Sequence, residues 1–146
     1  MLEFKITIGH LYVFQMIHKE ALAMPKSYNI GVEATIDVIG GKWKPVILCH
    51  LQNNGLMRTS ELKRAIPTIT QKMLTQQLRE LEKDGIINRI VYNEVPPKVE
   101  YELSQYGKSL SNILSALCYW GEFHVEKLYN QGENVSLLRQ DHVNIP

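Results

Sequence analysis

The apolar positions between residues 32 and 52 recur at helical spacing in two short segments. In the first, they form one stripe that stops at Gly40-Gly41, which predicts a helix over 32–39. In the second, they follow a Pro, a residue tolerated in a first helical turn, and continue to the break at Asn53-Asn54-Gly55. This predicts another helix over about 43–52.

Two more short helices follow, and they form a helix-turn-helix pattern. Thr59 is predicted to cap the start of the third helix, and Pro67 ends it. The fourth begins in Thr68-Ile69-Thr70-Gln71, which contains two candidate caps, and runs to about Asp84 before Gly85 stops it. Two short helices joined by a few residues, the second starting at a polar cap, are typical of this motif.

Beyond these helices the apolar period changes to that of a strand. Residues 87–92 are rich in β-formers, and residues 98–103 alternate between polar and apolar side chains. The stretch Asn93-Glu94-Val95-Pro96-Pro97 between them cannot continue a strand. The pattern predicts a β-hairpin, which is called the wing below.

Ser104 is predicted to cap a long helix over 104–129 that carries one broad apolar stripe. The expected fold is therefore mainly α with a small β-hairpin (α+β), a winged helix-turn-helix domain with N- and C-terminal dimerisation helices. A single winged domain would leave much of the stripe in water, which favours a dimer interface there. The predicted interface residues are Ile36, Ile39, Ile113, Leu114, Leu117, Trp120, Gly121, His124 and Leu128. The alternative is packing within the subunit, which we expect to claim Tyr106 and Leu110.

The fourth helix has one apolar face and one polar face. On a helical wheel, its leucines at 74, 78 and 81 define a buried stripe, and Lys72, Gln76, Arg79 and Lys83 lie near the opposite pole. Gln can pair with adenine and Arg with guanine when such a helix enters the major groove. The alternative is an ordinary solvent-facing surface, since these residues are also good helix formers.

Other polar residues extend this candidate DNA-binding surface. Thr68 and Thr70, at the capped start of the fourth helix, are suited to clamp a phosphate. Arg89 and Lys98 on the wing are candidate phosphate anchors, or simply hairpin charges. The full set of predicted DNA contacts is Thr68, Thr70, Gln71, Lys72, Thr75, Gln76, Arg79, Arg89 and Lys98.

Size and charge are compatible with this interpretation. The 146 residues suit one domain, predicted over 30–129, with an N-terminal extension over 1–29 and a C-terminal tail over 130–146. The net charge is only +1, but residues 42–98 hold ten Lys and Arg against five Asp and Glu. A basic middle between acidic ends suits a domain that offers one face to a polyanion.

The sequence offers little support for an enzyme. No Ser/His/Asp order, metal-ligand spacing or Gly-rich phosphate loop stands out, so we expect no catalytic residue, metal or cofactor. Cys49 and Cys118 lack any ligand spacing and are expected to be two buried thiols in a reducing cytosol. Residues 1–24 are too interrupted to span a bilayer or to form a good signal peptide. They are expected to form an extra amphipathic helix, or to precede a start at Met24, in a cytoplasmic protein.

Four stretches of the chain resemble the HxlR family of bacterial winged-helix regulators. They are residues 32–45 with Gly-Gly-Lys-Trp, Arg58-Thr59-Ser60-Glu61-Leu62, residues 69–81, and residues 96–103 with Pro-Pro-Lys-Val-Glu-Tyr. The resemblance implies a dimeric activator or repressor with the fourth helix in the major groove and the last helix at the dimer interface. It also implies DNA contacts by Thr70, Lys72, Thr75, Gln76, Arg79 and Lys98.

One departure from the family pattern concerns redox sensing. Several members carry a sensing cysteine in a Cys-Pro-x-Glu context before the first helix, and here the aligned residues are Ile30-Gly31-Val32-Glu33. The expected partners are double-stranded DNA, a second copy of the chain and an unknown small-molecule effector, with no membrane. Two alternatives stay open: a winged helix that binds protein, and a related regulator that binds phenolic ligands.

Overall fold

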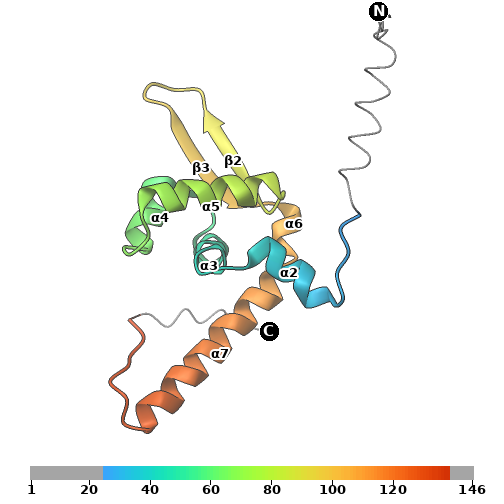
Figure 1. Cartoon of the computed structure of the whole chain (residues 1–146). Coiled ribbons are helices and arrows are strands. Elements are labelled where there is room, and N and C mark those ends of the chain that lie inside the picture. Colours follow the sequence, from blue (N-terminus) through green and yellow to red (C-terminus); the bar gives the residue numbers. More distant parts are fainter. Residues whose placement is uncertain (1–24, 139–146) are drawn as a thin grey trace, which may run out of the picture. The chain divides into compact units, whose positions relative to one another are not determined.

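The computed structural model describes residues 25–138 of the 146 (Figure 1). Among these residues, 25–34 and 35–138 belong to separate compact units, and the second holds every helix and strand except the first four residues of helix α2 (Gly31–Ile39). The predicted helix within 1–24 lies outside the described residues. In the part of the chain that is described, no helix is long and apolar enough to cross a membrane.

Four helices correspond to those expected before the wing, with ends shifted by one or two residues. They are α2 (Gly31–Ile39), α3 (Lys44–Asn54), α4 (Thr59–Ala65) and α5 (Gln71–Lys83). The predicted cap of α4 is wrong, because Arg58 occupies the N-cap position and Thr59 is already helical. The end of α5 is as expected: Gly85 follows it with φ of 73°, a left-handed conformation that glycine adopts without strain.

The predicted wing is an antiparallel hairpin of β2 (Ile87–Tyr92) and β3 (Lys98–Leu103), with Arg89 opposite Tyr101. A two-residue strand, β1 (Met57–Arg58), pairs with the other side of β3, so the sheet order is β1-β3-β2. Strand β1 could not be predicted from the sequence, because a strand of two residues is too short to show an alternating pattern.

The single long C-terminal helix predicted from the sequence is wrong, because the chain forms two helices. Ser104 caps only α6 (Gln105–Lys108), accepting a hydrogen bond from the Gly107 N–H, and α7 (Ser111–Asn130) follows. Between them the backbone bonds shorten to three-residue turns, from Ser109 N–H to Tyr106 O and from Leu110 N–H to Gly107 O. Ser104 also bonds the backbone at the start of the sheet, which fixes α6 against the wing.

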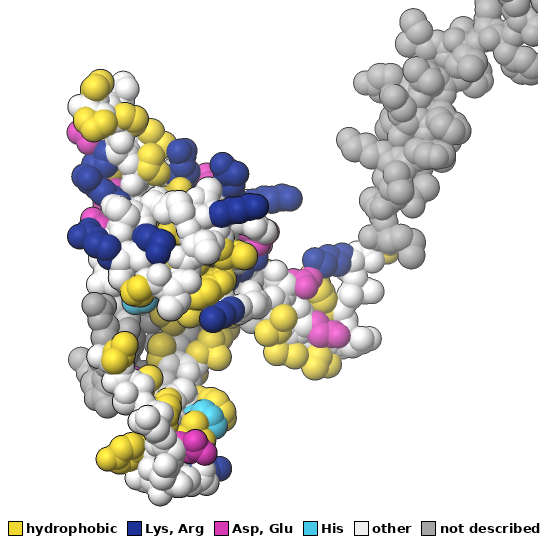
Figure 2. All heavy atoms as spheres, turned by 60° about the vertical axis from the view of Figure 1, so that its left-hand side comes forward, with side chains coloured by type: hydrophobic (Ala, Val, Ile, Leu, Met, Phe, Trp, Pro, Cys, Tyr) yellow, Lys and Arg dark blue, Asp and Glu magenta, His cyan; other side chains and the backbone are white. Residues whose placement is uncertain are grey.

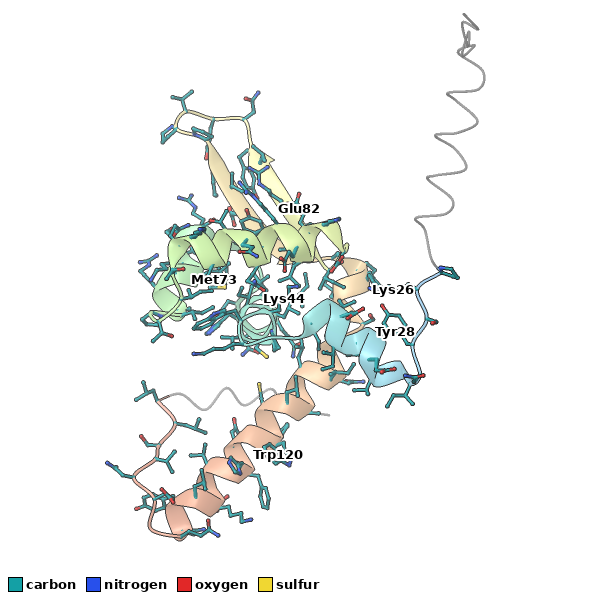
Figure 3. All side chains as sticks on the ribbon, in the orientation of Figure 1. Lys26, Tyr28, Lys44, Met73, Glu82 and Trp120 are labelled. Atoms are coloured by element: carbon teal, nitrogen blue, oxygen red, sulfur yellow. The ribbon has the colours of Figure 1, made fainter. Side chains whose placement is uncertain are left out.

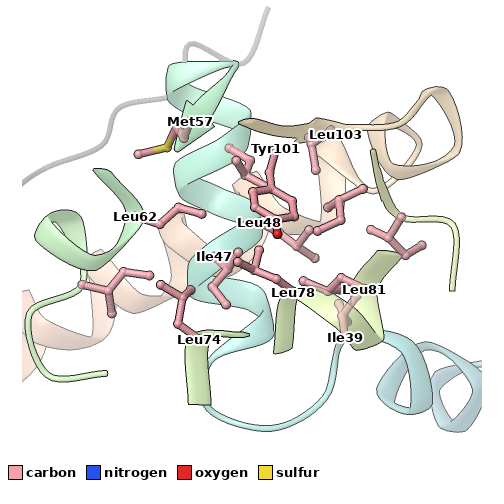
Figure 4. Packing of buried hydrophobic residues seen from close by; sticks show 14 of the residues in the cluster. Ile39, Ile47, Leu48, Met57, Leu62, Leu74, Leu78, Leu81, Tyr101 and Leu103 are labelled. Carbon is pink, nitrogen blue, oxygen red and sulfur yellow. The ribbon is translucent and has the colours of Figure 1, made fainter. Parts of the chain in front are cut away.

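The hydrophobic core lies between α3, α5 and the sheet (Figure 4). Leu74, Leu78 and Leu81 of α5 are at most 1% exposed and meet Ile47 and Leu48 of α3. Burying a side chain of this size contributes about 2 kcal/mol to stability. The apolar face predicted for the fourth helix is therefore the face that packs inward.

Burial corrects part of the predicted dimer interface. Ile39 and Leu114 are 4% and 0% exposed within one subunit, so they belong to the core and cannot form an outer surface. Leu110 packs against the core as expected. Tyr106 does not, because it lies on the short α6 and is 64% exposed.

Candidate nucleic-acid interface

The start of α5 is built as a capped and exposed helix end. Thr70 is the N-cap, and its hydroxyl oxygen accepts a hydrogen bond from the Met73 N–H at 3.1 Å. Of the two candidate caps, Thr70 rather than Thr68 is used, and both side chains are exposed. The remaining first-turn N–H groups and the positive end of the helix dipole therefore face solvent, an arrangement that suits a phosphate.

The outer face of α5 carries the polar residues predicted to read DNA. Lys72, Gln76 and Arg79 are all exposed, and Lys83 at the end of the helix is exposed as well. Thr75 is half-buried, and its hydroxyl donates to the Gln71 carbonyl oxygen at 2.9 Å. In Figure 2, Lys and Arg side chains surround the part of the molecule formed by α5 and the wing.

A hollow joins this face to the wing. Its lining includes Arg79 and Thr75 from α5 and Arg89 from β2, together with Thr59, Gln71, Glu82, Val99 and Tyr101. The structure thus brings together helix and wing residues that the sequence places ten or more positions apart. Two guanidinium groups and one carboxylate, that of Glu82, line this hollow, so its charged groups are mainly cationic and suit an anionic backbone.

The Lys98 ammonium is less available to bind a phosphate than the sequence suggests. Its ammonium lies 2.7 Å from Glu100 Oε1 and 4.7 Å from the centre of the Tyr92 ring. The hydrogen bond to Glu100 raises the pKa of Lys98 above its usual 10.5. A phosphate at this position would therefore have to compete with Glu100 for the ammonium.

A carboxylate that the sequence analysis did not single out lies next to Gln76. Glu80 Oε2 is 2.7 Å from Lys44 Nζ of α3, and Glu80 Oε1 accepts a hydrogen bond from Gln76 Nε2 at 3.3 Å. Lys44 lies beneath α5 (Figure 3), and its side chain is only 11% exposed. Glu80 thereby restrains the Gln76 amide while tying α5 to α3. The i, i+4 spacing of Gln76 and Glu80 was the available signal.

The Glu80→Gln variant is expected to lose a pH-dependent part of the protein's stability. The hydrogen bond from Lys44, followed by that from Gln76, holds the pKa of Glu80 below its usual 4.5. A carboxylate with a lowered pKa stabilises the fold above the unfolded-state value, and this contribution is lost as pH falls through the folded-state value. The difference in urea stability between wild type and variant should therefore be constant near neutral pH and shrink below about pH 4.

The matched control for this prediction is Glu82→Gln, which removes an exposed carboxylate from the same helix. Denaturation midpoints at several pH values give the comparison. If the difference in unfolding free energy between the wild type and Glu80→Gln stays the same from pH 7 to pH 3, the Lys44–Glu80 ion pair does not contribute to stability.

The geometry of α5 and the wing agrees with a comparison against protein families. A model described as HxlR-like helix-turn-helix matches residues 38–129, which is more than half of the chain. The chain belongs to the HxlR-like helix-turn-helix family. The matched region contains all nine predicted DNA contacts and ends within α7.

Individual relatives of this HxlR-like protein are similar over most of their length. The uncharacterized HTH-type transcriptional regulator YtcD of Bacillus subtilis (strain 168) is 66% identical over 119 residues, which cover 82% of this chain and 92% of YtcD. A crystal structure of ytcD is 70% identical, covering 66% of this chain and 98% of that one, with a TM-score of 0.63. The redox regulator HypR in its reduced form is 50% identical, covering 69% and 99%, with a TM-score of 0.65. The predicted family and the predicted winged-helix fold class are both confirmed.

Proposed function

We propose that this HxlR-like protein is a sequence-specific DNA-binding transcription regulator that acts as a homodimer on an inverted-repeat operator. The observation that carries the proposal is the exposed face of Lys72, Gln76 and Arg79 on a helix whose opposite face is buried. The similarity to HTH-type transcriptional regulators supports the same function.

The proposed contacts divide into reading and anchoring roles. Gln76 and Arg79 are assigned to base edges in the major groove, because their planar donor groups match adenine and guanine. Thr68, Thr70 and Gln71 at the helix start, with Lys72, are assigned to the adjacent phosphates. Thr75 flanks the reading residues, and Arg89 and Lys98 anchor the wing to the neighbouring backbone.

The outer surface of α7 supports the homodimer. Its buried residues, Leu114 and Ser115, both lie in its first half. The helix extends away from α5 on the side opposite the wing (Figure 1), and Trp120 projects from its flank (Figure 3). Large apolar side chains exposed by 41% to 68% include Ile113, Leu117, Tyr119, Trp120, Phe123 and Tyr129. An apolar surface of this kind on one helix normally marks an interface.

A second copy of the chain is the occupant that fits this surface. Ile113, Leu117, Trp120 and His124 repeat at helical spacing along one face, and Trp120 stacks on His124 with ring centres 5.0 Å apart. In a two-fold dimer the same patch of both subunits meets, so a stripe along one helix can pack against its own copy. Ile36, Gly121 and Leu128 remain predicted members of the interface, since none of them is buried within the subunit. Two-fold symmetry would place the reading helices about 34 Å apart, on half-sites one helical turn apart.

Selection of binding sites from random duplex DNA tests the proposed function directly. The expected result is an inverted repeat with half-site centres about one helical turn apart. Binding to the selected site should weaken steeply between about 50 and 200 mM salt, because phosphate contacts release counterions. Enrichment of no sequence, together with salt-independent binding to a protein partner, would favour the protein-binding alternative.

The Gln76→Ala and Lys98→Ala variants are expected to separate reading from anchoring. Gln76→Ala should relax base preference at one position of each half-site, at a cost of about 1–3 kcal/mol for the preferred base. Lys98→Ala should weaken binding to all sequences similarly and reduce the dependence on salt. Affinity measurements on the selected site and on single-base variants give the comparison. An unchanged preference in Gln76→Ala would remove that residue from the reading set.

A further inference from the structure

The two cysteines, expected from the sequence to be separate buried thiols, meet in the structure. Cys49 lies on α3 and Cys118 on α7, and their sulfur atoms are 3.7 Å apart. Both are thiols and both are only partly buried. No spacing pattern predicted this contact, because 69 positions separate the two residues.

The contact is set by the packing of two helices. One turn from the sulfur atoms, Gln52 Nε2 of α3 donates to Ser115 Oγ of α7 at 3.2 Å. The pairs Cys49–Cys118 and Gln52–Ser115 lie one turn apart on both helices, so α3 and α7 touch over at least one turn. Leu51 and Leu114, the sequence neighbours of Gln52 and Ser115, are both fully buried, so the two helices are packed where these pairs lie. Both thiols are therefore carried by rigid elements rather than by loops.

We propose that Cys49 and Cys118 form a redox-active dithiol that a peroxide converts into a disulfide within one subunit. The thiolate of one cysteine attacks a peroxide oxygen, the O–O bond breaks, and a sulfenic acid and an alcohol or water result. The second thiol then attacks the sulfenic sulfur, an S–S bond forms, and water leaves. Each sulfur is oxidised by one electron, and the peroxide takes up both electrons.

The geometry requires only a small movement. A disulfide has its sulfur atoms about 2.05 Å apart, so the present separation has to close by less than about 2 Å. The bond would join α3, which supports the reading helix, to the helix proposed to hold the partner subunit. The proposed disulfide therefore does not involve position 30, where several other family members carry the sensing cysteine, and it does not link two subunits.

Oxidation of the reduced full-length protein by hydrogen peroxide tests the proposal. The expected product has lost the mass of two hydrogen atoms and migrates as a monomer on a non-reducing denaturing gel. Tryptic digestion should give one linked pair, residues 43–58 joined to residues 109–127, which dithiothreitol separates. The melting temperature should rise by about 5–10 °C, because the bond closes a long loop.

The Cys49→Ser and Cys118→Ser variants are the matched controls, because each keeps one thiol in the same environment. Neither should lose two hydrogens or gain melting temperature, and each should instead add oxygen to the remaining sulfur. Three results would overturn the proposal. They are oxygen adducts on the wild type in place of the linked peptides, a disulfide-linked dimer on the gel, and thiols that peroxide leaves unchanged.

Discussion

The Trp120→Glu variant is expected to be a folded monomer with little affinity for the operator. Trp120 is 66% exposed in the subunit, so a charge at this position costs the monomer little. In the proposed dimer, the same carboxylate would be desolvated against the apolar face of the partner's α7. Because a buried tryptophan is a typical hot spot, the dimer should weaken by at least about 2 kcal/mol, and often more.

Loss of the dimer should carry over to DNA binding. A dimer holds two reading helices on one operator, so binding by the second half-site is effectively intramolecular. Breaking the dimer should therefore lower operator affinity by a factor of about 10²–10⁴. Light scattering after size exclusion gives the oligomeric state, and a binding titration on the full operator and on a single half-site gives the affinities.

The Glu126→Lys variant is the matched control, because it changes the charge of an exposed residue on a different face of α7. It should remain a dimer at the same concentration. A Trp120→Glu protein that elutes and scatters as the wild type does would exclude the Trp120 face from the interface. The proposed reading role of α5 would then have to rest on another dimer arrangement.

The Leu78→Ala variant is expected to lose about 3 kcal/mol of unfolding free energy. Leu78 is 1% exposed, and it packs between the flanking leucines of α5 and the core residues of α3. Removing a fully buried leucine side chain typically costs 2–5 kcal/mol, because the hydrophobic transfer energy is lost and a cavity remains. Urea denaturation followed by circular dichroism, at one fixed protein concentration, measures the change.

The comparison variant is Gln76→Ala, which truncates an exposed residue two positions earlier on the same helix. Its stability should stay within about 0.5 kcal/mol of the wild type. The two variants therefore separate core packing from base recognition. Leu78→Ala should be less stable but keep its DNA base preference, and Gln76→Ala should keep its stability but lose part of that preference. A loss below about 1 kcal/mol in Leu78→Ala would mean that the inner face of α5 is not tightly packed.

The parts of the fold that the sequence predicted are those set by local periodicity. The two faces of α5 follow directly from residues 74, 78 and 81 against residues 72, 76 and 79, and the structure buries the first set alone. The two strands of the wing could also be predicted, since alternating polarity and the Pro-Pro sequence at the tip are local signals. The candidate reading residues could be named in advance because they lie on an amphipathic helix.

The parts that the sequence missed depend on contacts between distant segments. The break between α6 and α7 lies at Ser109 and Leu110, just after α6 packs against Ile86 through Ser104 and Gly107, and no helical wheel reveals that contact. Leu114 was predicted to lie at the dimer interface because it belongs to the same apolar stripe as Trp120. In the structure it is buried in the core of its own subunit. The proximity of Glu100 to Lys98 and of Cys49 to Cys118 likewise depends on strand pairing and helix packing.

Gly107 links the geometry of the sheet to that of the proposed dimer. A methyl group at this position would collide with the carbonyl oxygen of Ile86, so α6 can approach the sheet this closely only because the residue has no side chain. That approach sets the direction in which α7 leaves the domain. In the proposed dimer, a larger residue would tilt the helix that holds the second subunit, and we would expect the protein to favour a different separation of half-sites. A residue that touches neither the operator nor the partner would in this way help to choose the operator.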